Sequence, residues 1–212
     1  MPQAIPPYLG ELYEFLKKEV TWLHARWIIF DQLYSKGDPR LELLNDAGSS
    51  FFHMLQLMMY DDMQLWLARL TDDRRDTASL LQLQKRLESH GNAKLATTAK
   101  PVLEELLKLV DAIRENRDGM LAHYSLDQAT NPQAKKLPDV YYTDVVRSLE
   151  LVRQYMNLIE MHYHDCEQGY EHFVWQDDGD NLVTLLKWGL RYREILKTKG
   201  FFEEKRDKWS DA

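Results

Sequence analysis

The side chains best suited to chemistry are Arg117 and His123, in the segment ENRDGMLAHY from Glu115 to Tyr124. A guanidinium holds a phosphate and stabilises charge developing on it, and an imidazole exchanges protons near neutral pH. On an ideal helix the two residues lie about 120° apart around the axis and about 9 Å apart along it. The long arginine side chain, or a bend at Gly119, would bring both to one phosphate. The pair therefore predicts phosphate chemistry.

The same two residues also have a structural interpretation. Arg117 can form an ion pair with Asp118, Glu115 or an acidic helix, and His123 can cap the last carbonyl groups of its helix. An arginine and a histidine at this spacing occur by chance in many proteins, so the residues alone do not decide between the two interpretations.

A second group with ligand chemistry surrounds the single cysteine and comprises His162, His164, Cys166 and, further on, His172. On a continuous helix His162 and Cys166 share a face, whereas His164 points nearly opposite. Only one pair could therefore bind the same ion, and a metal would need ligands from elsewhere. We predict no metal site here, and no cofactor. A metal-bound helical bundle is the most distant of the alternatives.

Composition limits the class of protein. The chain has 212 residues, 44% of them hydrophobic, and a net charge of -7, which is typical of a soluble globular domain. The acidic balance opposes a broad nonspecific grip on nucleic acid, although a local basic patch stays open. One cysteine excludes an intramolecular disulfide and agrees with a reducing compartment. With no signal peptide and no apolar run of about 20 residues, we expect a cytoplasmic protein without a membrane span.

Hydrophobic periodicity of about 3.6 residues runs through long segments that few glycines and prolines interrupt. This pattern predicts an all-α bundle of about five to seven helices. Four methionines at helical spacing are expected to pack in the core: Met54, Met58, Met59 and Met63. The first predicted helix opens at Pro6-Pro7 and is stopped by Gly37-Asp38-Pro39. The others run from about Leu41 to about Leu70; from a cap at Thr77 or Ser79 to Leu87; from Pro101, in a first turn, into the 117–123 segment; from Val140 to about Cys166; and from Asp180, as a cap, to Lys197.

Two stretches lack helical periodicity. Residues 124–139 contain Pro132 and Pro138, and we predict a surface loop there, long enough to suggest function. After Gly169, residues 170–181 are expected to be strand-like or irregular. We therefore predict one helical domain over residues 1–168, with a C-terminal helical extension over 169–212 packed on it.

Arg117 to His123 matches the short motif of the HEPN superfamily (higher-eukaryote and prokaryote nucleotide-binding domains): an arginine, four to six residues, and a histidine. The polar residue that commonly follows the arginine is present as Asp118. The order of motifs resembles the abortive-infection branch related to the AbiU-type phage-resistance protein. The motifs that carry this resemblance are Leu44-Asn45 with Phe51-Phe52, Leu67 to Asp72, and Arg117 to His123. Gly119 departs from the pattern, because that position is often basic.

The resemblance implies a helical bundle that forms a homodimer and joins two Arg-His motifs in an interface cleft. In active relatives this cleft is a metal-independent endoribonuclease that acts in phage defence or as a toxin. His123 would transfer the proton, Arg117 would hold the phosphate, and Asp118 would orient the motif. We add Arg114, one helical turn earlier, as a predicted RNA phosphate contact.

The alternative is a non-catalytic HEPN-like module. In that case Arg117 and His123 would only hold a dimer together, as the binding half of a defence or toxin-antitoxin system with a partner protein. An active enzyme predicts RNA cleavage without metal, and the module predicts dimerisation without turnover.

Overall fold

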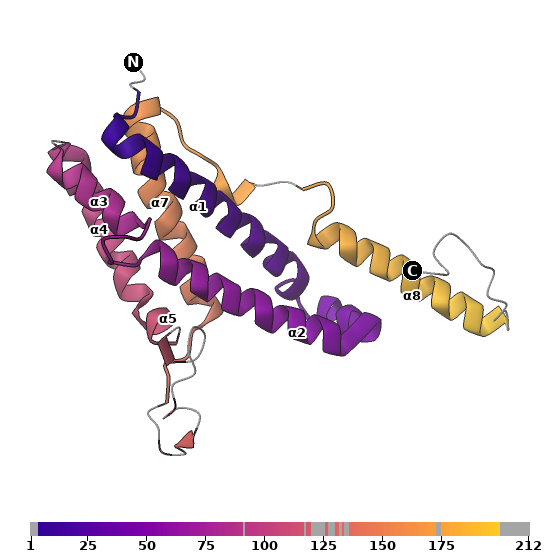
Figure 1. Ribbon diagram of the computed structural model, residues 1–212. Coiled ribbons are helices and arrows are strands. Elements are labelled where there is room, and N and C mark those ends of the chain that lie inside the picture. Colours follow the sequence, from indigo (N-terminus) through magenta and orange to yellow (C-terminus); the bar gives the residue numbers. More distant parts are fainter. Residues whose placement is uncertain are drawn as a thin grey trace. The chain divides into compact units, whose positions relative to one another are not determined.

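A computed structural model of the chain describes residues 4–90, 92–116, 118–119, 126, 130–131, 133, 136–172 and 175–199. All regular secondary structure within these residues is helical (Figure 1), which confirms the predicted all-α class. The helices are α1 (Pro7–Tyr34), α2 (Asp38–Leu70), α3 (Leu80–Ser89), α4 (Ala93–Leu109), α5 (Asp111–Asn116), α7 (Tyr142–His164), the 3₁₀-helix η2 (Tyr170–His172) and α8 (Gly179–Lys199).

The chain divides into two units by its spatial contacts. The larger unit comprises Met1–Ile28 and Leu57–Phe173, and the smaller unit comprises Ile29–Gln56 and Val174–Ala212. The long helices α1 and α2 each contribute to both units. The predicted division into a helical bundle over residues 1–168 and an extension over residues 169–212 stays a prediction.

In the larger unit, α1 runs antiparallel to α2. Glu19 of α1 pairs with Arg69 of α2 at 3.6 Å, and Arg26 pairs with Asp62 at 3.0 Å. The guanidinium carbons of Arg26 and Arg69 lie 4.3 Å and 4.9 Å from the ring centre of Trp66, whose indole attracts both cations. Apolar side chains of α1, α2, α3, α4, α5 and α7 form one continuous core.

Helix α7 is the centre of the packing in this unit. The Tyr155 side chain is fully buried, and its hydroxyl donates a hydrogen bond to Gln84 Oε1 of α3 at 3.1 Å. The Gln84 amide in turn donates to the carbonyl oxygen of Ala96 in α4 at 3.0 Å. At the surface, Arg147 of α7 pairs with Glu105 of α4 at 2.6 Å. These contacts join α3, α4 and α7.

Helix α4 differs from the prediction at both ends. It begins at Ala93, because the Asn92 side chain caps it by accepting a hydrogen bond from the Leu95 N–H at 3.4 Å. Pro101 therefore lies inside the helix, where the missing N–H is tolerated because apolar side chains on both sides of it are buried. The helix ends at Leu109, and the short helix α5 follows after Val110.

Other helix boundaries shift for local reasons. Helix α2 begins at Asp38, directly after Gly37, whose φ of 88° makes the turn. It is interrupted at Gly48, whose backbone is not helical. Helix α7 ends at His164, because its C-cap residue Asp165 adopts a left-handed conformation, with φ of 55°. The predicted core stripe of methionines is wrong in part, since Met63 is buried whereas Met54 and Met58 are exposed.

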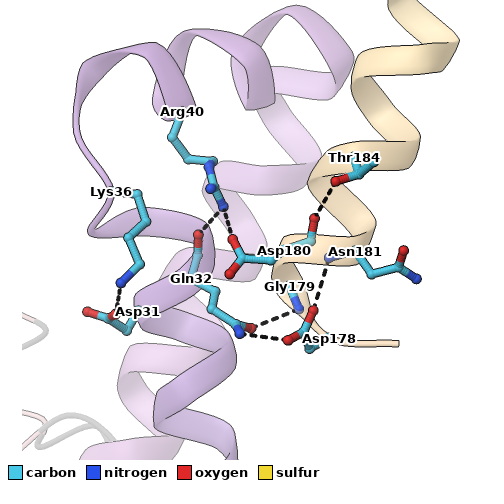
Figure 2. A network of polar contacts seen from close by, with 9 residues as sticks. All are labelled: Asp31, Gln32, Lys36, Arg40, Asp178, Gly179, Asp180, Asn181 and Thr184. Carbon is cyan, nitrogen blue, oxygen red and sulfur yellow. Dashed lines mark hydrogen bonds and ion pairs between the residues drawn. The ribbon is translucent and has the colours of Figure 1, made fainter. Parts of the chain in front are cut away.

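Helix α8 starts in a polar network of the smaller unit (Figure 2). The cap is Asp178 rather than the predicted Asp180, because the Asp178 carboxylate accepts a hydrogen bond from the Asn181 N–H at 3.0 Å. Gln32 of α1 donates to Asp178 at 2.8 Å and accepts from the Gly179 N–H at 2.9 Å. Arg40 of α2 pairs with Asp180 at 2.9 Å. The first turn of α8 is thus held by α1 and α2.

Candidate functional site

The short helix α5 leads directly into the Arg-His motif, and Arg114 anchors it. Ile113 is fully buried in the core, which fixes the helix on the larger unit. Arg114 directs its guanidinium toward the end of α2, where Nη2 donates a hydrogen bond to the carbonyl oxygen of Thr71. Its Nη1 donates to Asp111 at 3.1 Å. A cation at the C-terminal end of a helix is favourable, so Arg114 ties α5 to α2.

Residues on both sides of Arg117 contact the end of the segment that precedes α7. The Asn116 side chain donates a hydrogen bond to the carbonyl oxygen of Pro138 at 2.7 Å. A Cβ atom at Gly119 would lie 2.8 Å and 2.9 Å from the two methyl carbons of Leu137. Only glycine permits this close approach without displacing Leu137. The motif position that is often basic in relatives is therefore a packing position here.

The same segment is fixed to α2 by Tyr60. The Tyr60 hydroxyl donates a hydrogen bond to the carbonyl oxygen of Val140 at 3.0 Å. Burial, with a smaller contribution from the Asp144 carboxylate, raises the pKa of Tyr60 to about 12. The phenol therefore remains a neutral hydrogen-bond donor at physiological pH. These contacts join α5 and Gly119 to the end of α2 and to residues 137–140, and we call this set of contacts the frame of the motif.

Arginines near the end of α2 could form the local basic patch that the sequence leaves open, but their charges are partly neutralised. Arg69 and Arg74 flank Thr71 in the sequence, but Arg69 pairs with Glu19 at 3.6 Å and Arg74 with Asp72 at 3.1 Å. Among the described arginines of this patch, Arg75 alone has no carboxylate within ion-pair distance, and it is exposed. Positive charge at this end of α2 is thus smaller than the number of arginines suggests.

The predicted site residues divide into two groups. Arg117 and His123, the proposed phosphate clamp and proton-transfer group, lie outside the described residues, so their placement stays a prediction. Asp118 is described and exposed. Arg114 is described and is 26% exposed, with two of its N–H groups already bonded to Thr71 and Asp111. A phosphate contact by Arg114 would use its remaining N–H groups.

The histidines near Cys166 point to separate partners. His162 is hydrogen-bonded to the Asn92 side chain at 3.0 Å, and His164 to Glu160 at 2.5 Å. Cys166 is exposed. Within the described part of the chain, no three His, Cys, Asp or Glu side chains converge in a way that would hold a metal ion.

The frame of the motif was not foreseen from the sequence. Leu137 and Pro138 lie in the stretch without periodicity, and their contacts with Gly119 and Asn116 join positions about twenty residues apart. Gly119 offered the one available signal, because a glycine replacing a larger residue within a motif indicates a close approach.

The chain combines an all-α fold with an Arg-to-His sequence motif that follows helix α5. The family model HEPN_AbiU2, described as AbiU2, matches residues 7–184. The chain therefore belongs to the AbiU2 family of HEPN domains, and the family predicted from the motifs is confirmed. The match begins at the first residue of α1 and ends within the first two turns of α8.

Two further findings complete the comparison. No curated protein and no solved structure matches the chain. None of the helices in the described residues combines the length and the apolar character that crossing a bilayer requires.

Proposed function

We propose that the protein is a metal-independent endoribonuclease of phage defence, which acts in the cytoplasm as a homodimer. Two copies of the Arg117–His123 motif would meet in a cleft between protomers. The RNA 2′-hydroxyl attacks the adjacent phosphorus, so that a 2′-O–P bond forms and the P–O5′ bond breaks. The products are a 2′,3′-cyclic phosphate and a 5′-hydroxyl end.

Each motif residue has a role in this reaction. One His123 imidazole accepts the proton of the attacking 2′-hydroxyl, and an imidazolium from the other protomer protonates the leaving 5′-oxygen. Arg117 holds the phosphate and stabilises the additional negative charge in the transition state. Asp118 orients the motif. Arg114 acts mainly through the position of α5, because two of its N–H groups are bonded within the protein.

The observation that supports the proposal most is membership in the AbiU2 family with the motif inside the matched residues. The frame of the motif adds to it. Catalysis of phosphoryl transfer depends on fixed positions of the charged groups. In the sequence on either side of Arg117, Asn116 is hydrogen-bonded to Pro138 and Gly119 lies against Leu137.

Purified protein should cut mixed cellular RNA in the presence of EDTA, and His123→Ala and Arg117→Ala should each abolish cutting. Losing a proton-transfer group costs about 10²- to 10⁴-fold in rate, which is enough to remove detectable products. His162→Ala is the matched control, because this histidine lies near the surface end of α7 and is hydrogen-bonded to Asn92.

Each variant must keep its helical content and its sedimentation coefficient. If the folded, dimeric wild type cuts no RNA, the protein is instead a binding or dimerisation module that acts with a partner protein. Cutting that survives both substitutions would contradict the assignment of the site.

A further inference from the structure

Helix α8 repeats a basic-aromatic pair on one side. Lys187 precedes Trp188, and four residues later Arg191 precedes Tyr192. Residues four apart share a helix face and lie about 6 Å apart along the axis. The two aromatic side chains thus form one stripe and the two cations form a second stripe beside it. Trp188 is 62% exposed and Tyr192 is 63% exposed.

The contacts that the described residues make with α8 involve other sides of the helix. Its first turn is fixed by Gln32, Asp178 and Arg40, as Figure 2 shows. Val183 is buried, and further along Arg193 donates a hydrogen bond to the carbonyl oxygen of Asp46 at 3.5 Å. Trp188 and Tyr192 lie on another side of the helix, where Leu185 and Ile195 extend the exposed stripe.

The charge of α8 is opposite to that of the whole chain. Between Leu185 and Thr198 there are four basic residues and one acidic residue, whereas the chain has a net charge of -7. Lys197 is paired with Glu194 at 2.9 Å. Lys187 and Arg191 form no ion pair with any described residue. The cations beside the two aromatic rings are therefore available to a ligand.

We infer that α8 binds single-stranded RNA, with bases stacked on Trp188 and Tyr192 and phosphates held by Lys187 and Arg191. Exposed rings beside unpaired cations are the features that hold single strands without regard to sequence. The choice of RNA over other polyanions rests on the proposed function. The family match ends at residue 184, before both pairs, so this surface lies outside the matched part.

The charges favour RNA over a second copy of the chain. Two α8 helices paired through this stripe would bring Lys187 and Arg191 of both copies together, and like charges in contact are unfavourable. An apolar protein helix would cover the aromatic rings but would leave both cations without counter-charges. A polyanion with bases provides rings that stack on the aromatic stripe and phosphates that neutralise the cationic stripe.

The test measures the binding of a labelled single-stranded RNA of mixed sequence by fluorescence anisotropy, in a His123→Ala background that leaves the RNA uncut. The Trp188→Ala, Tyr192→Ala double variant should bind the RNA at least about tenfold more weakly than the parent. The Lys187→Gln, Arg191→Gln double variant should reduce the slope of log K against log salt by about 1.4, the value for two phosphates of a single strand.

The control is the Glu194→Gln, Lys197→Gln double variant, which alters the same helix without changing its net charge and should bind within about twofold of the parent. Unchanged RNA affinity in both test variants would overturn the inference. A loss of dimer mass in the aromatic variant, with RNA affinity unchanged, would show that the stripe is a protein interface instead.

The outcome is separable from that of the proposed function. If the wild type cuts no RNA but binds it through α8, the ribonuclease proposal fails and this inference holds. If the wild type cuts RNA and the α8 variants bind as tightly as the parent, only this inference fails.

Discussion

At the scale of single residues, Arg114 shows how a candidate ligand contact can be a structural tie. Its guanidinium bonds the carbonyl oxygen of Thr71 at the end of α2. Arg114→Ala should therefore lower the free energy of unfolding by about 1 to 2 kcal/mol, because a charged hydrogen bond is lost. The measurement is urea unfolding at neutral pH.

Arg75→Ala provides the comparison, since Arg75 is exposed and lacks an ion pair among the described residues. It should change stability by no more than about 0.5 kcal/mol. If Arg114→Ala is as stable as Arg75→Ala and only RNA binding weakens, Arg114 is a phosphate contact and the structural role is wrong.

Glu160 makes stability depend on pH. Its side chain is 2% exposed, and it accepts hydrogen bonds from Lys17 of α1 and from His164. Burial acts to raise the pKa of this carboxyl, but its interactions with Lys17, Tyr13 and His164 together outweigh burial and leave the pKa of Glu160 below its usual value. The unfolded carboxyl therefore takes up a proton at higher pH than the folded one does.

The stabilisation from Glu160 is thus complete above the pKa of the unfolded state and is lost as the pH falls through the folded pKa. Glu160→Gln should cost about 2 kcal/mol at neutral pH and should flatten the loss of stability toward about pH 3. The measurement is the free energy of unfolding in urea between neutral pH and about pH 3, with Glu194→Gln, at an exposed position, as the control. An acid limb as steep in Glu160→Gln as in the wild type would refute the assignment.

At the scale of helices, Ser79 fixes the start of α3. Ser79 is fully buried, and its hydroxyl oxygen accepts a hydrogen bond from the Gln82 N–H at 3.3 Å. Ser79→Ala should lower stability by about 1 kcal/mol, because an N-cap bond is lost. Ser89→Ala, at the exposed end of the same helix, should change stability by less than about 0.5 kcal/mol. Equal effects of the two substitutions on thermal unfolding would contradict the capping role.

Helix boundaries show where sequence reasoning succeeds. Ser79 was one of the two predicted caps of α3, with Thr77, and the end of α1 near Gly37 was predicted, because capping side chains and glycine act on their own neighbours. The caps Asn92 and Asp178 were missed. In each case the sequence offered a later helix start, Pro101 for α4 and Asp180 for α8. Tertiary contacts determine that the helix starts at the earlier position. Gln32 holds Asp178 in the capping position, and buried apolar residues carry α4 through Pro101.

At the scale of the whole molecule, periodicity and motif order predicted the all-α class and the family. The frame of the candidate site was not predictable in this way, because Pro138 and Leu137, which contact Asn116 and Gly119, lie in a stretch that carries no periodic pattern. Helix α8 differs again. Its apolar residues Leu185, Trp188 and Tyr192 are exposed. Periodicity shows that a helix has an apolar face, but not which partner covers it.

The most direct measurement of the central claim compares two RNA oligonucleotides that differ by one oxygen atom. One is all-RNA, and the other has a 2′-deoxyribose immediately 5′ of the mapped cut. In EDTA, the protein should cut the all-RNA oligonucleotide to a 2′,3′-cyclic phosphate and a 5′-hydroxyl end, and should leave the same linkage intact in the 2′-deoxy oligonucleotide. Equal cutting of both, or products with a 5′-phosphate, would mean that the 2′-hydroxyl is not the nucleophile and would contradict the proposed reaction.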